Sequence, residues 1–207
     1  AHQTTDTFDH VFTSDRNFFD RYYFNLHASS DELFMVFGLG QYPNLGVTDA
    51  FASISHGDTQ YTVRASRELG SDRMDTSCGP FKFEVLEGLK KLRIQCDDNE
   101  WGLAFDVTWD GSQHPLEEPK SIKKSFNRTV MDNARFAQTG CYTGSLEIDG
   151  QSYTVEPTKW KGARDRSWGV RGVGEPEPPG IRVTEERAHG FFHNWMPMQF
   201  EDYMIKT

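Results

Sequence analysis

Hydrophobic and polar residues alternate along most of this chain, which is the pattern of a half-buried β-strand. In Phe81–Glu87, for example, Phe81, Phe83 and Val85 share one face of the predicted strand. A longer run puts five apolar side chains on one face, and these are Trp101, Leu103, Phe105, Val107 and Trp109. A face of this kind requires a core to pack against.

Several other segments show the same period and are separated by turn residues. They are Tyr22–Ala28, Glu32–Gly40, Asp49–Ser55, Thr59–Leu69 and Lys90–Cys96. The sharpest hairpin signal joins Cys141–Ile148 to Gln151–Thr158 through Asp149-Gly150, a pair typical of a type I′ turn. We therefore expect neighbouring strands to pair antiparallel through short hairpins.

Two segments interrupt the alternation. Asp110–Lys124 contains two prolines and six charged residues, and we expect an exposed loop there, followed by a short helix around Ile122–Val130. Gly174–His189 is rich in Pro, Gly and Glu, and the same composition predicts a linker or surface loop. The chain then ends on a strand-like segment.

Many short strands with almost no helical period predict an all-β fold. We expect an antiparallel lipocalin-like barrel of the calycin type, or a strongly curved sandwich, with helix in under about a tenth of the residues. A closed or nearly closed barrel leaves few edge strands, which this many strands would otherwise expose.

Composition narrows the class of partner. Aromatic residues make up 14% of the 207 residues, which indicates a folded protein with an aromatic core. The net charge of −9 argues against general nucleic-acid binding, because an acidic surface repels phosphate. No apolar run approaches the ~20 residues of a membrane span.

The three cysteines are far apart and form no CxxC motif, so neither a zinc knuckle nor a thioredoxin-type site is indicated. We expect Cys78, Cys96 and Cys141 to be buried free thiols in a reducing cytosol. His189 and His193 are four residues apart, but they lie in a strand-like segment where this spacing separates the side chains. We therefore expect no metal and no cofactor.

The densest cluster of specific side chains is "WKGARDRSWGVR", Trp160 to Arg171. One interpretation is structural: Arg164, Arg166 or Arg171 holds Asp165 under a Trp cover, with Gly162 and Gly169 allowing a bend. The other is functional: Trp160 and Trp168 wall a pocket for an apolar ligand, and Asp165 serves as a general acid if burial raises its pKa. The sequence leaves both open.

The cluster and its surroundings resemble a known family. The hairpin at Asp149-Gly150, the bend Trp160-Lys161-Gly162, the D-x-x-W-G segment Asp165–Gly169 and the strand Trp195–Asp202 are similar to the AttH-like, carotenoid 1,2-hydratase-like group. Its members have two lipocalin-related β-barrels in tandem. The resemblance covers most of the chain, and the D-x-x-W-G segment is its most specific part.

The resemblance implies a domain plan and a ligand class. It implies a lipocalin-like barrel over residues 1–173, a linker over 174–190, and in 191–207 the first strand of a second barrel, which is then a partner domain of the same protein. It also implies an apolar ligand such as a lipid, an isoprenoid or a steroid-like compound. Aromatic residues that would contact this ligand are Trp160, Trp168, Trp101, Phe105, Trp109 and Trp195.

Three functions therefore remain open at this stage. The first is binding of a hydrophobic small molecule in or beside the barrel, which needs only a lined cavity. The second is an enzyme of isoprenoid or polyketide hydration or cyclisation, with Asp165 as the acid. The third is a non-catalytic scaffold for protein contacts. The lack of a second acid or His partner near Asp165 favours binding.

Overall fold

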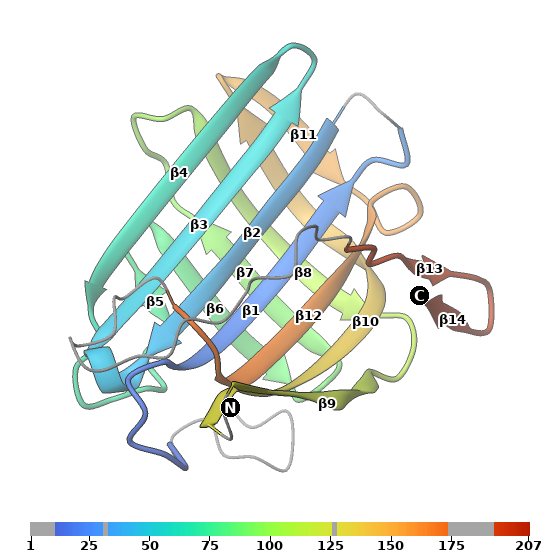
Figure 1. Cartoon of the computed structure of the whole chain (residues 1–207). Helices are drawn as coiled ribbons and strands as arrows, with labels where there is room; N and C mark the ends of the chain where they lie inside the picture. Colours follow the sequence, from blue (N-terminus) through green and yellow to red (C-terminus); the bar gives the residue numbers. More distant parts are fainter. Residues whose placement is uncertain (1–10, 31–32, 126–127, 174–192) are drawn as a thin grey trace.

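Most of the chain folds into one curved antiparallel sheet. The computed structural model describes residues 11–30, 33–125, 128–173 and 193–207, and within them twelve strands form this sheet. The sheet curls into a nearly closed barrel (Figure 1). The one helix in these residues is a three-residue 3-10 turn, η1 (Pro43–Leu45). The all-β barrel predicted from the alternation is thereby confirmed.

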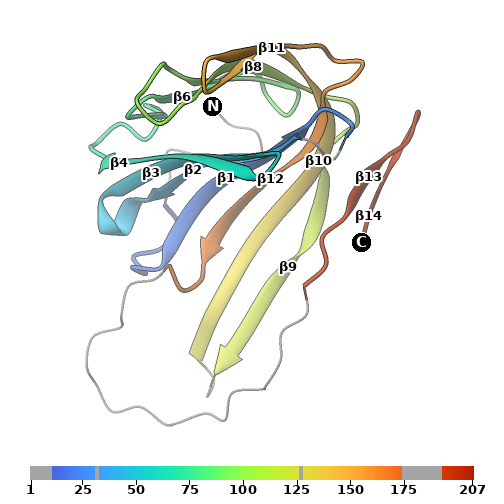
Figure 2. The ribbon, with the colours of Figure 1, turned by 90° about the horizontal axis from the view of Figure 1, so that it is seen from above.

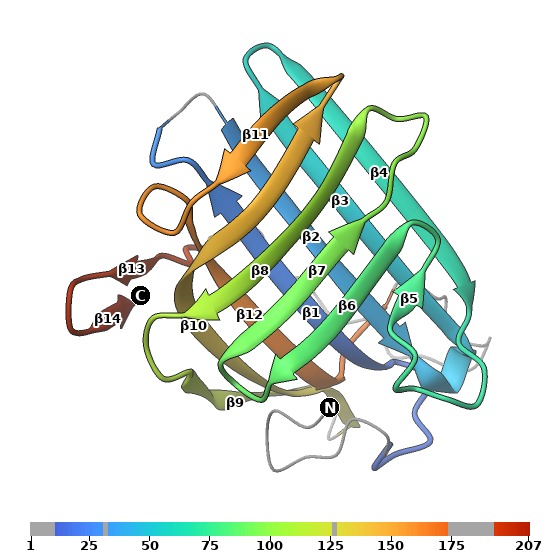
Figure 3. The same cartoon turned by 180° about the vertical axis from the view of Figure 1, so that it is seen from behind.

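Hairpins generate most of the barrel. The first half is a meander of four strands: β1 (Phe18–His27), β2 (Leu33–Tyr42), β3 (Val47–His56) and β4 (Thr59–Glu68). A second series follows on the opposite side of the barrel (Figure 3): β5 (Ser77–Cys78), β6 (Phe81–Glu87), β7 (Lys91–Cys96) and β8 (Leu103–Gly111). The sheet order is β4-β3-β2-β1-β12-β10-β8-β7-β6-β5.

The long strand β10 (Arg128–Ile148) joins the two halves. Along one edge it pairs first with β12 (Lys161–Val170) and then with β11 (Gln151–Val155). Along the other edge it pairs first with β9 (Leu116–Ser125) and then with β8. Gly144 of β10 lies just after the residues that pair with β12, and its φ is +138°. A Cβ at this position would lie 2.0 Å from the Asp106 carbonyl oxygen. Glycine is therefore required where β10 turns from one set of partners to the other.

The predicted faces are largely confirmed. Phe81 and Phe83 point into the core, and so do Leu103, Phe105, Val107 and Trp109 of β8. The Asp149-Gly150 turn is also confirmed, since both residues have positive φ between β10 and β11. The inward placement of Trp101 is wrong: this residue lies in the turn before β8 and is 48% exposed.

The expected loop at Asp110–Lys124 and the helix at Ile122–Val130 are both wrong. Leu116–Ser125 forms β9, and β10 already begins at Arg128. The pairing of β9 with β10 slips next to Pro119, between the Glu118–Arg135 and Ser121–Asn133 pairs. A proline is tolerated at such a bulge because a regular ladder bond is not required of it. Pro119 therefore marks a bulge within a strand, whereas Pro115 lies in the short connection between β8 and β9.

A small hairpin follows the barrel. β13 (Pro197–Gln199) pairs with β14 (Met204–Lys206) and lies beside β10 and β9 (Figure 2). Lys206 Nζ lies 3.2 Å from Glu118 Oε2, which connects this C-terminal hairpin to β9. The predicted linker, 174–190, and His189 lie outside the described residues, so the proposed domain limits stay a prediction. Within the described residues, no helix has the length and the apolar character that crossing a bilayer requires.

Candidate functional site

Strand β12 carries the D-x-x-W-G segment and presents two different faces. Arg164, Arg166 and Trp168 alternate into the interior and are almost fully buried. Asp165 lies between them and faces the outside of the barrel, opposite Tyr23 of β1 and Ala137 of β10. Strand geometry separates these side chains, because successive residues point to opposite faces.

The inner face of β12 has a buried ionic network. Arg166 Nη2 donates to Asp20 Oδ2 at 2.8 Å, and Arg73, from the loop between β4 and β5, reaches the same oxygen at 3.4 Å. Arg73 Nε also donates to Gln41 Oε1, at 3.1 Å. The Arg166 guanidinium lies 4.6 Å from the centre of the Trp168 ring. This network connects β12, β1, β2 and the β4–β5 loop at one end of the barrel.

Arg164 makes a second inward contact. Its Nε donates to Gln138 Oε1 at 2.8 Å, and its guanidinium lies 5.1 Å from the centre of the Phe136 ring. Burial lowers the pKa of Arg164 to about 10, so the side chain stays charged at neutral pH. Both inward arginines therefore connect neighbouring strands of the barrel.

The predicted pairing of Asp165 with Arg164, Arg166 or Arg171 needs correction. Asp165 Oδ2 lies 3.3 Å from Arg135 Nε of β10, on the outer face, while Arg166 pairs with Asp20. Arg171 stacks on Phe19, 4.4 Å from the ring centre, and it contributes only a longer-range attraction to Asp165. Desolvation raises the pKa of Asp165, and this effect is larger than the lowering by Arg135.

Most of the aromatic residues predicted to bind a ligand are part of the barrel core. Trp109 and Phe105 are buried in it, and Trp160 packs edge-on against Tyr153 with 6.4 Å between ring centres. Trp168 packs with Phe136 in a smaller cluster next to Arg166. The ligand-binding role of these residues stays a prediction, and Trp195 is the predicted residue that lines a cavity described below.

That cavity is a groove of about 840 Å³ on the outside of the barrel, here called the outer groove. The C-terminal hairpin and its approach form one wall, which is mostly apolar: Trp195, Met196, Pro197, Met198 and Phe200. The outer faces of β1, β12 and β10 form the other wall, with Tyr23, Asn25, His27, Lys161, Ala163 and Thr139. This volume lies within the ~300–1,000 Å³ of small-molecule sites.

The two ends of the outer groove differ. At one end the Tyr23 and Trp195 rings meet edge to face, with 5.9 Å between their centres. Desolvation raises the pKa of Tyr23, and Asp165 lies directly opposite it on β12. At the other end a row of cross-strand neighbours, Phe34, His27 and Lys161, runs across β2, β1 and β12.

Sequence reasoning missed this second row. His27, Phe34 and Lys161 lie on strands that were correctly predicted or adjoin them, but nothing local shows that the three strands are neighbours. The pairing of β1 with β12, which joins the two ends of the barrel domain, brings His27 and Lys161 together. An outward His opposite an outward Lys would have been a usable signal once that pairing was known.

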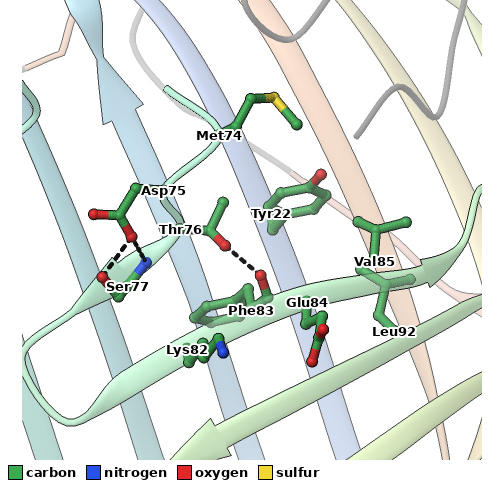
Figure 4. Close-up of a pocket in the computed structure, with 10 residues that line it drawn as sticks. All are labelled: Tyr22, Met74, Asp75, Thr76, Ser77, Lys82, Phe83, Glu84, Val85 and Leu92. Carbon is green, nitrogen blue, oxygen red and sulfur yellow. Dashed lines mark hydrogen bonds between the residues drawn. The ribbon is translucent and has the colours of Figure 1, made fainter. Parts of the chain in front are cut away.

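A second cavity lies at the end of the barrel, between the β4–β5 loop and β6 (Figure 4). It measures about 260 Å³, with Tyr22, Phe83 and Leu92 on the barrel side and Met74 on the loop side. Much of its polar lining already has partners: Asp75 accepts from Ser77, and the Thr76 hydroxyl donates to the Phe83 carbonyl. This barrel-end cavity is smaller than typical small-molecule sites.

Comparisons with solved structures support the fold. A Nitrosomonas europaea protein assigned as an AttH superposes with a TM-score of 0.56 at 12% identity, over 76% of this chain and 53% of that one. Kievitone hydratase from Nectria haematococca superposes with a TM-score of 0.53 at 18% identity, over 72% of this chain and 47% of that one. The chain thus spans about half the length of these two proteins. The fold is AttH-like, as the resemblance implied.

Sequence comparisons place the chain in a family without giving it an activity. A search of curated proteins finds no match. A family model matches the whole chain, residues 1–207, and its description is "Family of unknown function (DUF8625)". This protein therefore belongs to the family of unknown function DUF8625.

Proposed function

We propose that this protein binds a hydrophobic small molecule, of the size of a lipid, isoprenoid or steroid-like compound, in the outer groove beside its barrel. The observation that carries the proposal is the groove itself, about 840 Å³ between a sheet face and an apolar wall. The barrel interior suits a ligand less well, because core side chains such as Phe24, Phe37 and Trp109 fill it in mutual contact.

Two methionines allow a matched test of the site. Met198 lines the outer groove and Met74 lines the barrel-end cavity, and both are about equally exposed. Wild type, Met198→Ser and Met74→Ser are titrated with fatty acids, isoprenoids and sterols, with tryptophan fluorescence and thermal shift as readouts. Losing a partly buried Met contact of about 1 kcal/mol should weaken binding roughly fivefold in Met198→Ser and leave Met74→Ser unchanged.

The opposite result would place the ligand at the end of the barrel. If no apolar compound binds wild type with a dissociation constant below about 100 µM, about −5.5 kcal/mol, the binding proposal fails and the scaffold function replaces it. A melting temperature that rises with ligand concentration would show that the compound binds the folded protein.

Acid-catalysed chemistry on the bound molecule is the second candidate. It is favoured by the raised pKa of Asp165 and by its position opposite Tyr23, which lines the outer groove. A general acid needs a pKa near the working pH, and desolvation raises the pKa of Asp165 towards that range. Conversion of a bound isoprenoid or polyketide by wild type, and its loss in Asp165→Asn with binding retained, would establish this role. Retained turnover in Asp165→Asn would exclude it.

Two further features of the setting are proposed. The reducing cytosol is the proposed compartment, supported by Cys78, Cys96 and Cys141, none of which forms a disulfide. A second barrel of the same protein is the proposed neighbour of the C-terminal hairpin, supported by exposed Phe200 and Ile205. Hydroxyl-radical footprinting with and without such a barrel tests the contact, because a true neighbour should protect both side chains.

A further inference from the structure

The end of the outer groove at His27 and Lys161 is built from hydrogen-bond donors. Lys161 Nζ donates one of its three N–H bonds to the Pro157 carbonyl at 2.7 Å. The Ser29 backbone N–H donates to His27 Nδ1 at 3.1 Å. An imidazole that accepts at Nδ1 carries its proton on Nε2 when it is neutral, and Nε2 is then a donor. Burial lowers the pKa of His27, which keeps the ring neutral at pH 7.

Sheet register brings these two donors together. His27 of β1 is the direct cross-strand partner of Lys161 of β12, and both line the outer groove. Directly opposite residues have Cβ atoms about 4.5–5.5 Å apart, so one small group can contact both. Phe34, opposite His27 on β2, is 47% exposed and adds an apolar surface beside the pair.

Lys161 gives this end of the groove a positive charge, whereas the protein as a whole is acidic. The chain has a net charge of −9, which repels anions in general. Among the described residues that line the outer groove, Glu201 is the one carboxylate, and it is exposed on the hairpin wall. The lining therefore combines an apolar wall with a localised pair of donors, one of them cationic.

We propose that the outer groove selects apolar molecules that end in a carboxylate, and that Lys161 and His27 donate to this carboxylate. The rest of the molecule then extends along β1 towards the Tyr23–Trp195 contact. Tyr23 lies four positions before His27 on β1, which corresponds to about 13 Å along the strand. This inference rests on the proposed function and adds the chemical class of the ligand to it.

The test compares each acid with its own methyl ester. Dodecanoic acid, naphthylacetic acid and a farnesyl-derived acid, each paired with its methyl ester, are titrated below their micellar concentrations into wild type, Lys161→Met and Lys159→Met. Lys161→Met keeps the apolar stem and removes the ammonium. Lys159→Met removes an exposed charge two residues away and serves as the control for long-range attraction.

We expect wild type to bind at least one acid about tenfold more tightly than its ester, as a charge-assisted hydrogen bond would give. Lys161→Met should abolish this preference while ester binding changes less than about twofold, and Lys159→Met should keep it. Equal binding of acids and esters to wild type would overturn the carboxylate inference and leave the proposed function intact. Loss of the preference in both variants would overturn it too, because a general field would then explain it. Failure of every acid and ester to bind would overturn this inference, and the proposed function would fail as well only if the isoprenoids and sterols also did not bind.

Discussion

Replacing Gln138 tests whether the buried contacts of β12, the strand with the D-x-x-W-G segment, stabilise the barrel. Gln138 is 1% exposed, and its side-chain amide has three hydrogen-bond partners. Oε1 accepts from Arg164 Nε at 2.8 Å, and Nε2 donates to the carbonyls of Leu89 and Gln113 at 2.9 and 2.6 Å. An amide is required here, because no other side chain of this size both accepts and donates in this way.

Replacing Gln138 by Leu removes three hydrogen bonds while keeping most of the volume. One bond involves a charged partner and two are neutral, and we expect a loss of about 3 kcal/mol in the free energy of unfolding. For about 200 residues this corresponds to a fall of about 6–12 °C in Tm. Gln138→Glu keeps an acceptor for Arg164 but has no donors, so it should fall between Leu and wild type.

Urea unfolding followed by tryptophan fluorescence measures these differences. The control is Gln95→Leu. The Gln95 side chain, on β7, donates to Asp106 of β8 at 3.2 Å, and this substitution should change stability by less than about 0.5 kcal/mol. If Gln138→Leu were as mild as Gln95→Leu, the buried network around Arg164 would not stabilise the barrel, and the structural role assigned to Arg164 would be refuted.

The remaining predictions concern single residues. Because the pKa of Asp165 is raised in the folded protein, the native state holds the proton more readily, so wild-type stability relative to Asp165→Asn should fall as pH rises from about 4; parallel pH curves of urea unfolding would contradict this. Trp109→Ala should cost about 3–5 kcal/mol, while Trp101→Ala should cost less than about 0.5 kcal/mol; similar melting temperatures would argue against their different burial. Burial raises the pKa of Cys96 to about 12 and also raises that of Cys78, so a thiol reagent at pH 8 should modify both only after unfolding; rapid labelling of the native protein would disagree.

Local patterns predicted the strands well, because a two-residue period follows directly from the pleat. The Asp149-Gly150 turn was equally predictable, since a type I′ turn needs positive φ at both central residues. Leu116–Ser125 was mistaken for a loop because proline usually breaks a ladder, whereas here Pro119 lies at a bulge in the pairing of β9 with β10. Propensity alone does not show where a bulge falls.

The partners across the barrel were not predictable in the same way. Arg166 pairs with Asp20, which is 146 residues away in the sequence. No local pattern distinguishes the Asp20 carboxylate from that of the adjacent residue Asp165 as the partner of Arg166. The outer groove depends on the pairing of β1 with β12 and on how the C-terminal hairpin lies beside β10. Trp195 was nevertheless among the predicted ligand residues, and it lines the groove.

The most direct test of the central claim is to map a bound ligand by photo-crosslinking. A photoreactive apolar carboxylate is irradiated with the native protein, and the modified peptides are identified by mass spectrometry, with excess unlabelled acid as competitor. Binding in the outer groove predicts competable labels on the segment from Trp195 to Phe200 and on β1 between Tyr23 and His27. Labels concentrated around Met74 and Val85, in the barrel-end cavity, or labels that no competitor reduces, would contradict it.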